Sequence, residues 1–344
     1  MAIFYNESKI NGWNFDNNNI TKVYRNNAVV YQKITTGDTP TPPVPPTPSQ
    51  NYLTFVAKEN GTFQFTNSVD YSVNNGSTWT TLAANTATPT ITSGNKILWK
   101  ATLTPSSSGI GRFSSTGQFD VEGNEMSLLY GDNFVGEDDL TGKNNAFFGL
   151  FSGCTNVVSA ENLSLPATTL AQSCYYYMFY GCTNLTTAPE LPATTLASSC
   201  YNSMFYDCTS LTTAPVLSAT TLAQTCYSNM FRGCTNLTTA PELPATTLAQ
   251  YCYSNMFRDC TSLTTAPVLS ATRLALQCYR SMFSGCTNLN YIKCLATDIS
   301  ASNCTTTWVS NVAATGTFVK AASMTGWPTG PSGIPSNWTV VDDV

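Results

Sequence analysis

Cysteines recur every 26 residues through the second half of this 344-residue chain. One series is Cys174, Cys200, Cys226, Cys252, Cys278 and Cys304, and a second is Cys182, Cys208, Cys234, Cys260 and Cys286. The text between them repeats as well, because TNLTTAPELPATTLA at 183–197 returns at 235–249, and TSLTTAPVLSATTLA at 209–223 has a near copy at 261–275. Self-similarity at about 20–50 residues indicates stacked units that bury their apolar faces only against one another. We therefore expect a solenoid, an architecture that more often binds than catalyses.

Neighbouring copies of the repeat differ, whereas every second copy is alike, so the copied unit is two repeats, or 52 residues, long. Before the second cysteine, glycine in one copy alternates with aspartate in the next, and after the Ala-Pro pair glutamate alternates with valine. The residues concerned are Gly181, Asp207, Gly233, Asp259 and Gly285, and Glu190, Val216, Glu242 and Val268. This pattern indicates duplication of a pair of turns, which adds length and surface to the chain.

One repeat predicts a short helix followed by a short extended segment. Leu196, Cys200, Met204 and Cys208 recur every four residues, which we interpret as the apolar stripe of a helix. Leucine and alanine then follow at intervals of three over 211–217, where a proline limits any strand because it cannot donate to a ladder.

The pattern C-x-x-L-x-x-A-x-x-L-P-x-x-x-L followed by C-x-x-x-M-F-x-x-C resembles the BspA-like (treponemal-type) leucine-rich repeats of bacterial surface proteins, over about residues 150–310. In that family an Ala-Phe pair stands where this chain has Met204–Phe205. The sequence segments GDNF, NLSLPATTLA and IKCLATDIS are also similar to segments of repeat proteins of Bacteroidota and their tailed phages. The resemblance implies a leucine-rich-repeat solenoid that binds other molecules.

The thirteen cysteines are expected to be mainly reduced core residues. Their number is odd, and their positions are those of a buried ladder, in which cysteine behaves as a small hydrophobe. Disulfides between adjacent turns remain the alternative, because equivalent positions lie about 5 Å apart. The chain has no Cys-x-x-Cys pair and no histidine, so we expect no metal, no cofactor and no catalysis by a Ser–His–Asp or Cys–His arrangement. A dense acidic segment, Asp132 with 137–139, is interpreted as a solvated loop rather than a calcium or catalytic site.

The composition and the first residues indicate which class of partner and which cellular location to expect. Only 10% of residues are charged and the net charge is −5, which argues against nucleic acid and suits neutral partners such as glycans. No apolar stretch reaches the length of a membrane span, and residues 1–15 lack the features of a signal peptide. A bacterial surface adhesin needs an export signal, whereas a virion protein assembled in the host cytoplasm does not.

The chain is expected to be multidomain and β-rich, with a repeat solenoid. Residues 1–36 form a small N-terminal β module with a hairpin over 20–33, interpreted as a docking module or as an extra hairpin on the next domain. The segment 37–50, which holds six prolines, reads as a semi-rigid linker rather than an SH3 ligand. The remaining parts are an Ig-like β-sandwich at 51–125 with Trp79 and Trp99 in its core, a solenoid of 26-residue units at 126–310, and a C-terminal cap at 311–344.

A candidate binding stripe follows from helical phase. If Cys200 and Met204 face the core, Tyr206 and its equivalents lie on the outward side. This side carries the residue types enriched at binding hot spots, Tyr176, Tyr180, Tyr206, Arg232, Tyr251, Arg258 and Arg280, although outward helix positions are also free to vary without function. The alternative surface is the threonine-lined strand side, with pairs such as Thr212–Thr213.

These observations predict a non-enzymatic protein of a phage virion, a head or tail fibre or appendage. It is expected to attach to other virion proteins through residues 1–36, to be a homo-oligomer on the particle, and to present its repeats to a host-surface or mucosal glycan or protein. The alternative is a bacterial cell-surface adhesin of the same repeat family. An intracellular protein-binding scaffold explains the repeats but neither the linker nor the sparse charge.

Overall fold

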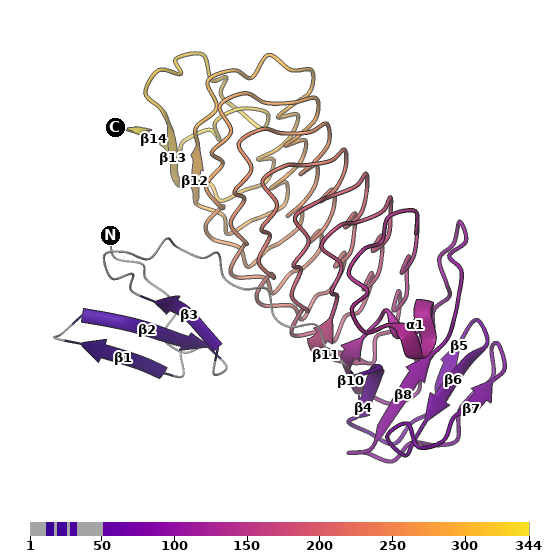
Figure 1. Ribbon diagram of the computed structural model, residues 1–344. Helices are drawn as coiled ribbons and strands as arrows, with labels where there is room; N and C mark the ends of the chain where they lie inside the picture. The colour runs from indigo at the N-terminus through magenta and orange to yellow at the C-terminus, as the bar shows by residue number, and fades with distance from the viewer. Residues whose placement is uncertain (1–11, 17–18, 26–27, 33–50, 344) are drawn as a thin grey trace. The chain divides into compact units, whose positions relative to one another are not determined.

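The computed structural model describes residues 12–16, 19–25, 28–32 and 51–343. The chain divides into two compact units, 1–47 and 48–344, and each is described by itself (Figure 1). The segment 37–50, predicted to be a linker, lies outside the described residues. Among the described residues, no helix is long and apolar enough to cross a membrane.

The first unit contains a three-stranded antiparallel sheet in the order β1-β2-β3. Its strands are β1 (Gly12–Asp16), β2 (Asn19–Arg25) and β3 (Ala28–Gln32). The hairpin predicted over 20–33 is confirmed, since Arg25 pairs with Ala28 and Lys22 with Gln32. The run containing Trp13 and Phe15 adds the third strand.

The second unit begins with two sheets. Six strands follow the order β11-β10-β4-β8-β6-β7, and β5 pairs with β9. The strands before the repeats are β4 (Leu53–Ala57), β5 (Phe63–Phe65), β6 (Val69–Ser72), β7 (Thr80–Leu82), β8 (Lys96–Lys100), β9 (Phe113–Ser115) and β10 (Phe119–Asn124). Trp99 is fully buried among phenylalanines, as predicted, whereas Trp79 is only half-buried and packs edge-on against Tyr52.

The six-stranded sheet runs directly into the repeats. The strand β11 (Val157–Ser164) pairs in parallel with β10, and its Ser159 forms a bridge to Thr187 one coil later. Between the two strands lie the short helix α1 (Ser127–Tyr130) and the 3-10 turn η2 (Gly131–Asn133). Beside them, the buried Glu125 accepts a hydrogen bond from the Tyr175 hydroxyl at 3.0 Å. The sheet and the first coils therefore share one continuous core.

The helix predicted from the four-residue stripe is wrong: residues 198–207 form a run of turns. The Met204 amide donates within the coil to Tyr201, whereas the neighbouring Phe205 amide donates to Met230 of the next coil at 3.0 Å. Every fourth residue adopts a positive φ, as Ser199, Ser203 and Asp207 do at 57°, 56° and 57°. Alternate amides therefore join successive coils, and the coils stack as Figure 1 shows.

The interior of the repeats contains columns of aromatic side chains in register, mostly of one residue type in each column. One column stacks Phe147, Tyr175, Tyr201, Tyr227, Tyr253, Tyr279 and Trp308, with ring centroids 5.5–6.3 Å apart. A second column of phenylalanines runs beside it from Phe151 to Phe283. Offset aromatic pairs contribute about 0.5–1.5 kcal/mol each beyond area burial. The repeat period is thus maintained by ring stacking as well as by backbone hydrogen bonds.

All thirteen cysteines are free thiols, and all are buried. In the second series each thiol donates to a phenylalanine carbonyl of the preceding coil, as Cys208 does to Phe179 at 3.1 Å. Cysteine suits this position because it is small, apolar and still a hydrogen-bond donor.

The last coils end in a parallel three-stranded sheet. Its strands are β12 (Tyr291–Cys294), β13 (Thr317–Ala321) and β14 (Thr339–Asp343). Trp308 packs against the last rings of both aromatic columns, and Trp327 stacks on Trp308 at 5.7 Å. Large indole rings therefore cover the end of the aromatic core.

Candidate functional site

Tyrosine and arginine side chains gather on the outer side of the turn segments. In each coil the first cysteine and the residue after it point inward. The fourth and fifth residues after that cysteine also point inward, so that one coil buries Cys200, Tyr201, Met204 and Phe205. The sixth position after the cysteine is partly exposed, whereas between the inward pairs Ser203, Ser228 and Ser254 are buried. Tyr180, Tyr206, Arg232 and Arg258 occupy this sixth position in four successive coils.

Aromatic rings touch one another continuously at one end of this row. Tyr176 packs edge-on against Tyr177 with centroids 4.3 Å apart, and Tyr177 packs against Tyr180 at 5.0 Å. Tyr180 then meets Tyr206 of the next coil at 5.1 Å, and Phe148 of the preceding coil stacks on Tyr176 at 5.3 Å. All five rings are partly exposed. They form an aromatic surface that crosses three coils.

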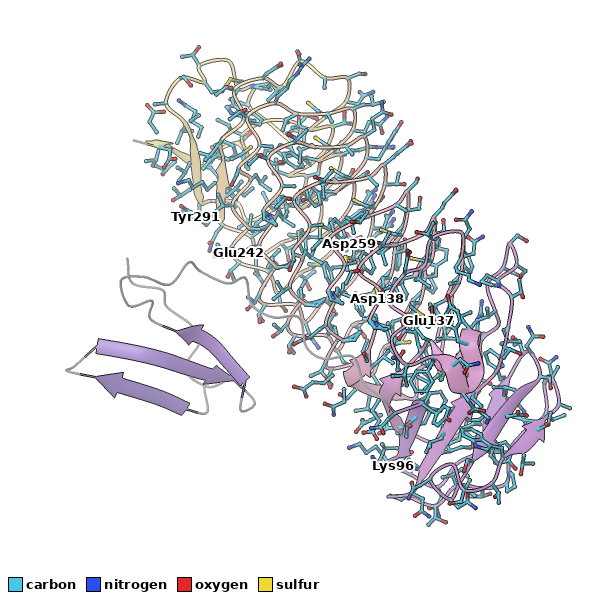
Figure 2. The ribbon with its side chains drawn as sticks, in the orientation of Figure 1. Lys96, Glu137, Asp138, Glu242, Asp259 and Tyr291 are labelled. Carbon is cyan, nitrogen blue, oxygen red and sulfur yellow. The ribbon has the colours of Figure 1, made fainter. Side chains whose placement is uncertain are left out.

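The arginines continue this surface on the next two coils. The Arg232 guanidinium lies over the Tyr206 ring, 5.0 Å from its centroid. Asp259, labelled in Figure 2, forms ion pairs with both arginines: its Oδ2 lies 3.9 Å from Arg232 Nε and 3.5 Å from Arg258 Nε. The side chain of Asp259 is 50% exposed and those of the two arginines 30% and 39%. We call the connected set the tyrosine–arginine patch: Phe148, Tyr176, Tyr177, Tyr180, Tyr206, Arg232, Arg258 and Asp259.

The alternation of glycine and aspartate has a steric cause beside this patch. A Cβ built on Gly233 would lie 2.0 Å from Asp207 Oδ1, and one on Gly285 would lie 2.2 Å from Asp259 Oδ1. Each aspartate side chain therefore fills the space above the glycine of the following coil. Burial raises the pKa of Asp207, while the nearby Arg232 charge lowers it. The 52-residue unit is thus a pair of coils that fit each other through this carboxylate.

The seven residues of the predicted stripe fall into two groups. Tyr176, Tyr180, Tyr206, Arg232 and Arg258 belong to the patch. Tyr251 and Arg280 belong to a second group, in which Gln277 donates to the Tyr251 hydroxyl at 3.3 Å and accepts from Arg280 at 3.1 Å. No ring or polar contact joins the second group to the patch within the described residues.

Sequence reasoning missed three members of the patch: Phe148, Tyr177 and Asp259. On a helix Tyr177 would lie nearer the core-facing stripe than the outward side, whereas in the structure its ring is partly exposed and contacts Tyr180. The run YYYMFY at 175–180 is the signal that could have indicated them. Three of its four tyrosines, at 176, 177 and 180, lie outside the buried column, which takes only Tyr175.

The threonine side, the alternative binding surface, contributes hydrogen bonds between coils. The Thr186 hydroxyl donates to the Val158 carbonyl at 2.9 Å, and the Thr238 hydroxyl donates to the Thr212 carbonyl at 3.2 Å. The backbones of Thr213 and Thr239 form a parallel bridge. Threonine hydroxyls therefore join one coil to the preceding one.

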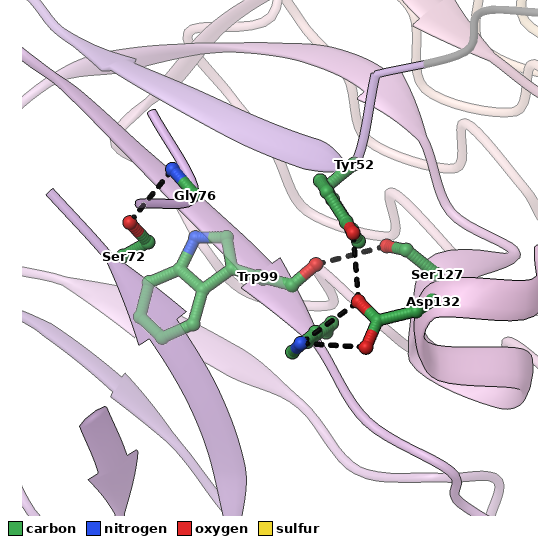
Figure 3. A network of polar contacts seen from close by, with 7 residues as sticks. Tyr52, Ser72, Gly76, Trp99, Ser127 and Asp132 are labelled. Atoms are coloured by element: carbon green, nitrogen blue, oxygen red, sulfur yellow. Dashed lines mark hydrogen bonds and ion pairs between the residues drawn. The ribbon is translucent and has the colours of Figure 1, made fainter. Parts of the chain in front are cut away.

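The carboxylates of the acidic segment near residue 132 have different partners. The Asp132 carboxylate accepts hydrogen bonds from the Tyr52 hydroxyl at 2.7 Å and from Lys100 at 2.8 Å (Figure 3). The Lys100 hydrogen bond lowers the pKa of Asp132, and burial with the Asp132 contact raises the pKa of Tyr52 to about 12. Asp139 instead accepts from the Thr141 amide at 2.7 Å. Within the described residues, no group of three or more acidic, cysteine or histidine side chains could hold a metal ion.

Comparisons with known proteins identify the repeats. Residues 148–264 and 217–317 match the family described as BspA type leucine rich repeat region, in six copies. Among solved structures, a leucine-rich-repeat protein of Treponema pallidum is similar, with 19% sequence identity and a TM-score of 0.30, over 63% of this chain and 81% of that one. No curated protein sequence matches the chain significantly. The family match covers the repeats, residues 148–317, which are similar to BspA type leucine-rich repeats.

Proposed function

We propose that this chain is a non-enzymatic adhesion protein whose leucine-rich-repeat solenoid binds a cell-surface or mucosal glycan through the tyrosine–arginine patch. The observation that carries the proposal is the contact of Tyr177, Tyr180 and Tyr206, three partly exposed rings from two coils. Tyrosine gives a rigid contact area at a low cost in conformational entropy and combines an apolar ring with a polar hydroxyl. Sugars, with apolar C–H faces and peripheral hydroxyls, are complementary to such rings.

The chemistry of the side chains supports binding rather than catalysis. The sequence contains no histidine, and burial raises the pKa of the thiols, to about 12 for Cys226 and Cys286. A thiol with a raised pKa is a poor nucleophile at neutral pH. The patch itself offers phenols, guanidiniums and one shared carboxylate, which are groups that position a ligand.

We further propose that the protein belongs to a virion, attached through residues 1–36, and that several copies are present on each particle. Assembly in a reducing cytoplasm fits thirteen buried free thiols. A bacterial surface protein of the BspA type is the alternative, and the repeat family favours it. Deleting 1–36 tests the attachment: particles should lose the protein while 51–344 stays folded, and normal incorporation would disprove the role.

Binding itself is tested with labelled protein and immobilised cell-surface polysaccharides. The double substitution Tyr180→Ala and Tyr206→Ala should weaken binding at least about tenfold, the effect of losing hot-spot side chains. Tyr251→Ala is the matched control, because this partly exposed tyrosine of the same surface lies in the second group. Unchanged binding in the double variant, with the melting temperature also unchanged, would contradict the proposal. Binding to a surface protein instead would replace the glycan by a protein ligand.

A further inference from the structure

We infer that the tyrosine–arginine patch selects an uncharged glycan chain and discriminates against acidic polysaccharides. This inference rests on the proposed function and specifies its ligand. Arginines beside tyrosines would ordinarily suggest an anionic ligand, because a guanidinium binds carboxylate and sulfate groups well. The contacts of Arg232 and Arg258 instead disfavour an anionic ligand.

Both guanidiniums are already paired inside the patch. Asp259 Oδ2 lies 3.5 Å from Arg258 Nε and 3.9 Å from Arg232 Nε, and Arg232 also stabilises the charged form of Asp207. With Asp207, which lies beside the patch, two positive and two negative side chains sum to zero charge here. The Asp259 side chain is also 50% exposed, so an acidic sugar on the arginines would face a carboxylate. Like charges at short distance disfavour such binding.

The aromatic end of the patch offers no fixed charge. The ring contacts of Tyr177 are with Phe148, Tyr176 and Tyr180, and Tyr180 contacts Tyr206 across the coil boundary. These rings present faces for stacking and phenolic hydroxyls that both donate and accept hydrogen bonds. Such groups match the hydroxyls and C–H faces of neutral hexoses.

The arrangement along the stack also favours a chain over a single sugar. Tyr180, Tyr206, Arg232 and Arg258 hold the same position in four successive coils. Hydrogen bonds from each coil to the next keep this position in register, as from Asp207 to Arg232. The complementary ligand is therefore extended and lies along the stacking direction.

The test compares a neutral polysaccharide, mannan, with an acidic one, alginate, by biolayer interferometry on the full chain at low and high salt. Mannan should bind with little dependence on salt, since screening acts on charge pairs, and alginate should bind at least about tenfold more weakly. Asp259→Asn should then raise alginate affinity at low salt several-fold, because it leaves Arg232 and Arg258 without their shared carboxylate. Asparagine suits this position, where φ is 63°.

The outcomes separate the two ideas. Tighter, salt-sensitive binding of alginate to the wild type, lost on changing Tyr180 and Tyr206 to alanine, would overturn the selectivity and leave the proposed function standing. Binding that ignores the tyrosine substitutions would overturn both. Asp207→Asn provides a second route to the same increase in alginate affinity if the first variant does not fold.

Discussion

Glu125 shows how one residue ties the first sheets to the repeats. Its carboxyl group is fully buried, with Oε1 accepting from Tyr175. Oε2 has no hydrogen-bond partner in the part of the chain that the structure describes. Burial raises the pKa of Glu125 from 4.5 to about 8, so the group is mainly protonated at neutral pH.

The protein should lose stability as pH rises from about 4.5 to about 8. Below 4.5 the group is protonated in both folded and unfolded states, whereas at higher pH the unfolded chain ionises first and is favoured. The free energy of unfolding, measured with denaturant at pH 5, 7 and 9, should fall by a few kcal/mol, on the order expected for such a shift. Glu125→Gln should flatten this profile and the exposed Glu190→Gln should not; identical profiles would contradict the assignment.

The pairing of Asp207 with Gly233 can be measured by a double-mutant cycle. Gly233→Ala should destabilise the protein, because its Cβ would approach Asp207 Oδ1 and because φ is 74° at this position. In an Asp207→Gly background the same change should cost about 1 kcal/mol less, since only the backbone term remains. Additive effects in thermal or chemical unfolding would mean that the aspartate does not determine the glycine.

At the scale of the element, the four-residue period was visible in the sequence but its interpretation was wrong. An α-helix advances about 100° per residue, so a strict spacing of four drifts by about 40° each time. Leu196, Cys200, Met204 and Cys208 hold that spacing without the correction to three that helices show. Turns that contain a positive φ at every fourth residue produce this strict spacing of four. Polar residues such as Ser199 and Ser203 adopt the positive φ because hydrogen bonds between coils stabilise it.

The hairpin over 20–33, the strands near Trp99 and the cysteine ladder were predictable, because each depends on local alternation or exact repetition. The patch was only partly predictable. The helical spacing correctly predicted that Tyr180 and Tyr206 lie on the outward side. That the arginines pair with Asp259 could not be predicted, because this pairing depends on contacts between coils, which the sequence of one repeat does not contain. The Ig-like topology of 51–125 stays a prediction.

Each of five successive coils has a fully buried methionine at the position of Met204, and these side chains should contribute strongly to the stability of the repeats. Met204→Ala should cost about 2–5 kcal/mol, because the side chain is fully buried and its removal leaves a cavity. Val216→Ala is the comparison variant: this side chain is 70% exposed, so its loss should change unfolding by less than about 0.5 kcal/mol. Equal effects in denaturant titrations would mean that these methionines are not packed.

At the scale of the whole molecule, the thiols report on the integrity of the stack. Thirteen buried thiols with raised pKa values should react with a thiol reagent only after unfolding. A titration without reductant should therefore find almost none in the native protein and nearly all thirteen in denaturant. Six disulfides would contradict both the free-thiol core and assembly in a reducing compartment.

The central claim is that the ligand lies on the tyrosine–arginine patch, and hydroxyl-radical footprinting tests it most directly. The full chain is oxidised with and without a saturating polysaccharide, and modification is read at each tyrosine by mass spectrometry. Tyr177, Tyr180 and Tyr206 should be protected, while the partly exposed Tyr251 keeps its reactivity and the buried Tyr201 stays unmodified in both states. Protection of Tyr251 without protection of Tyr180 and Tyr206 would place the ligand elsewhere and contradict the account.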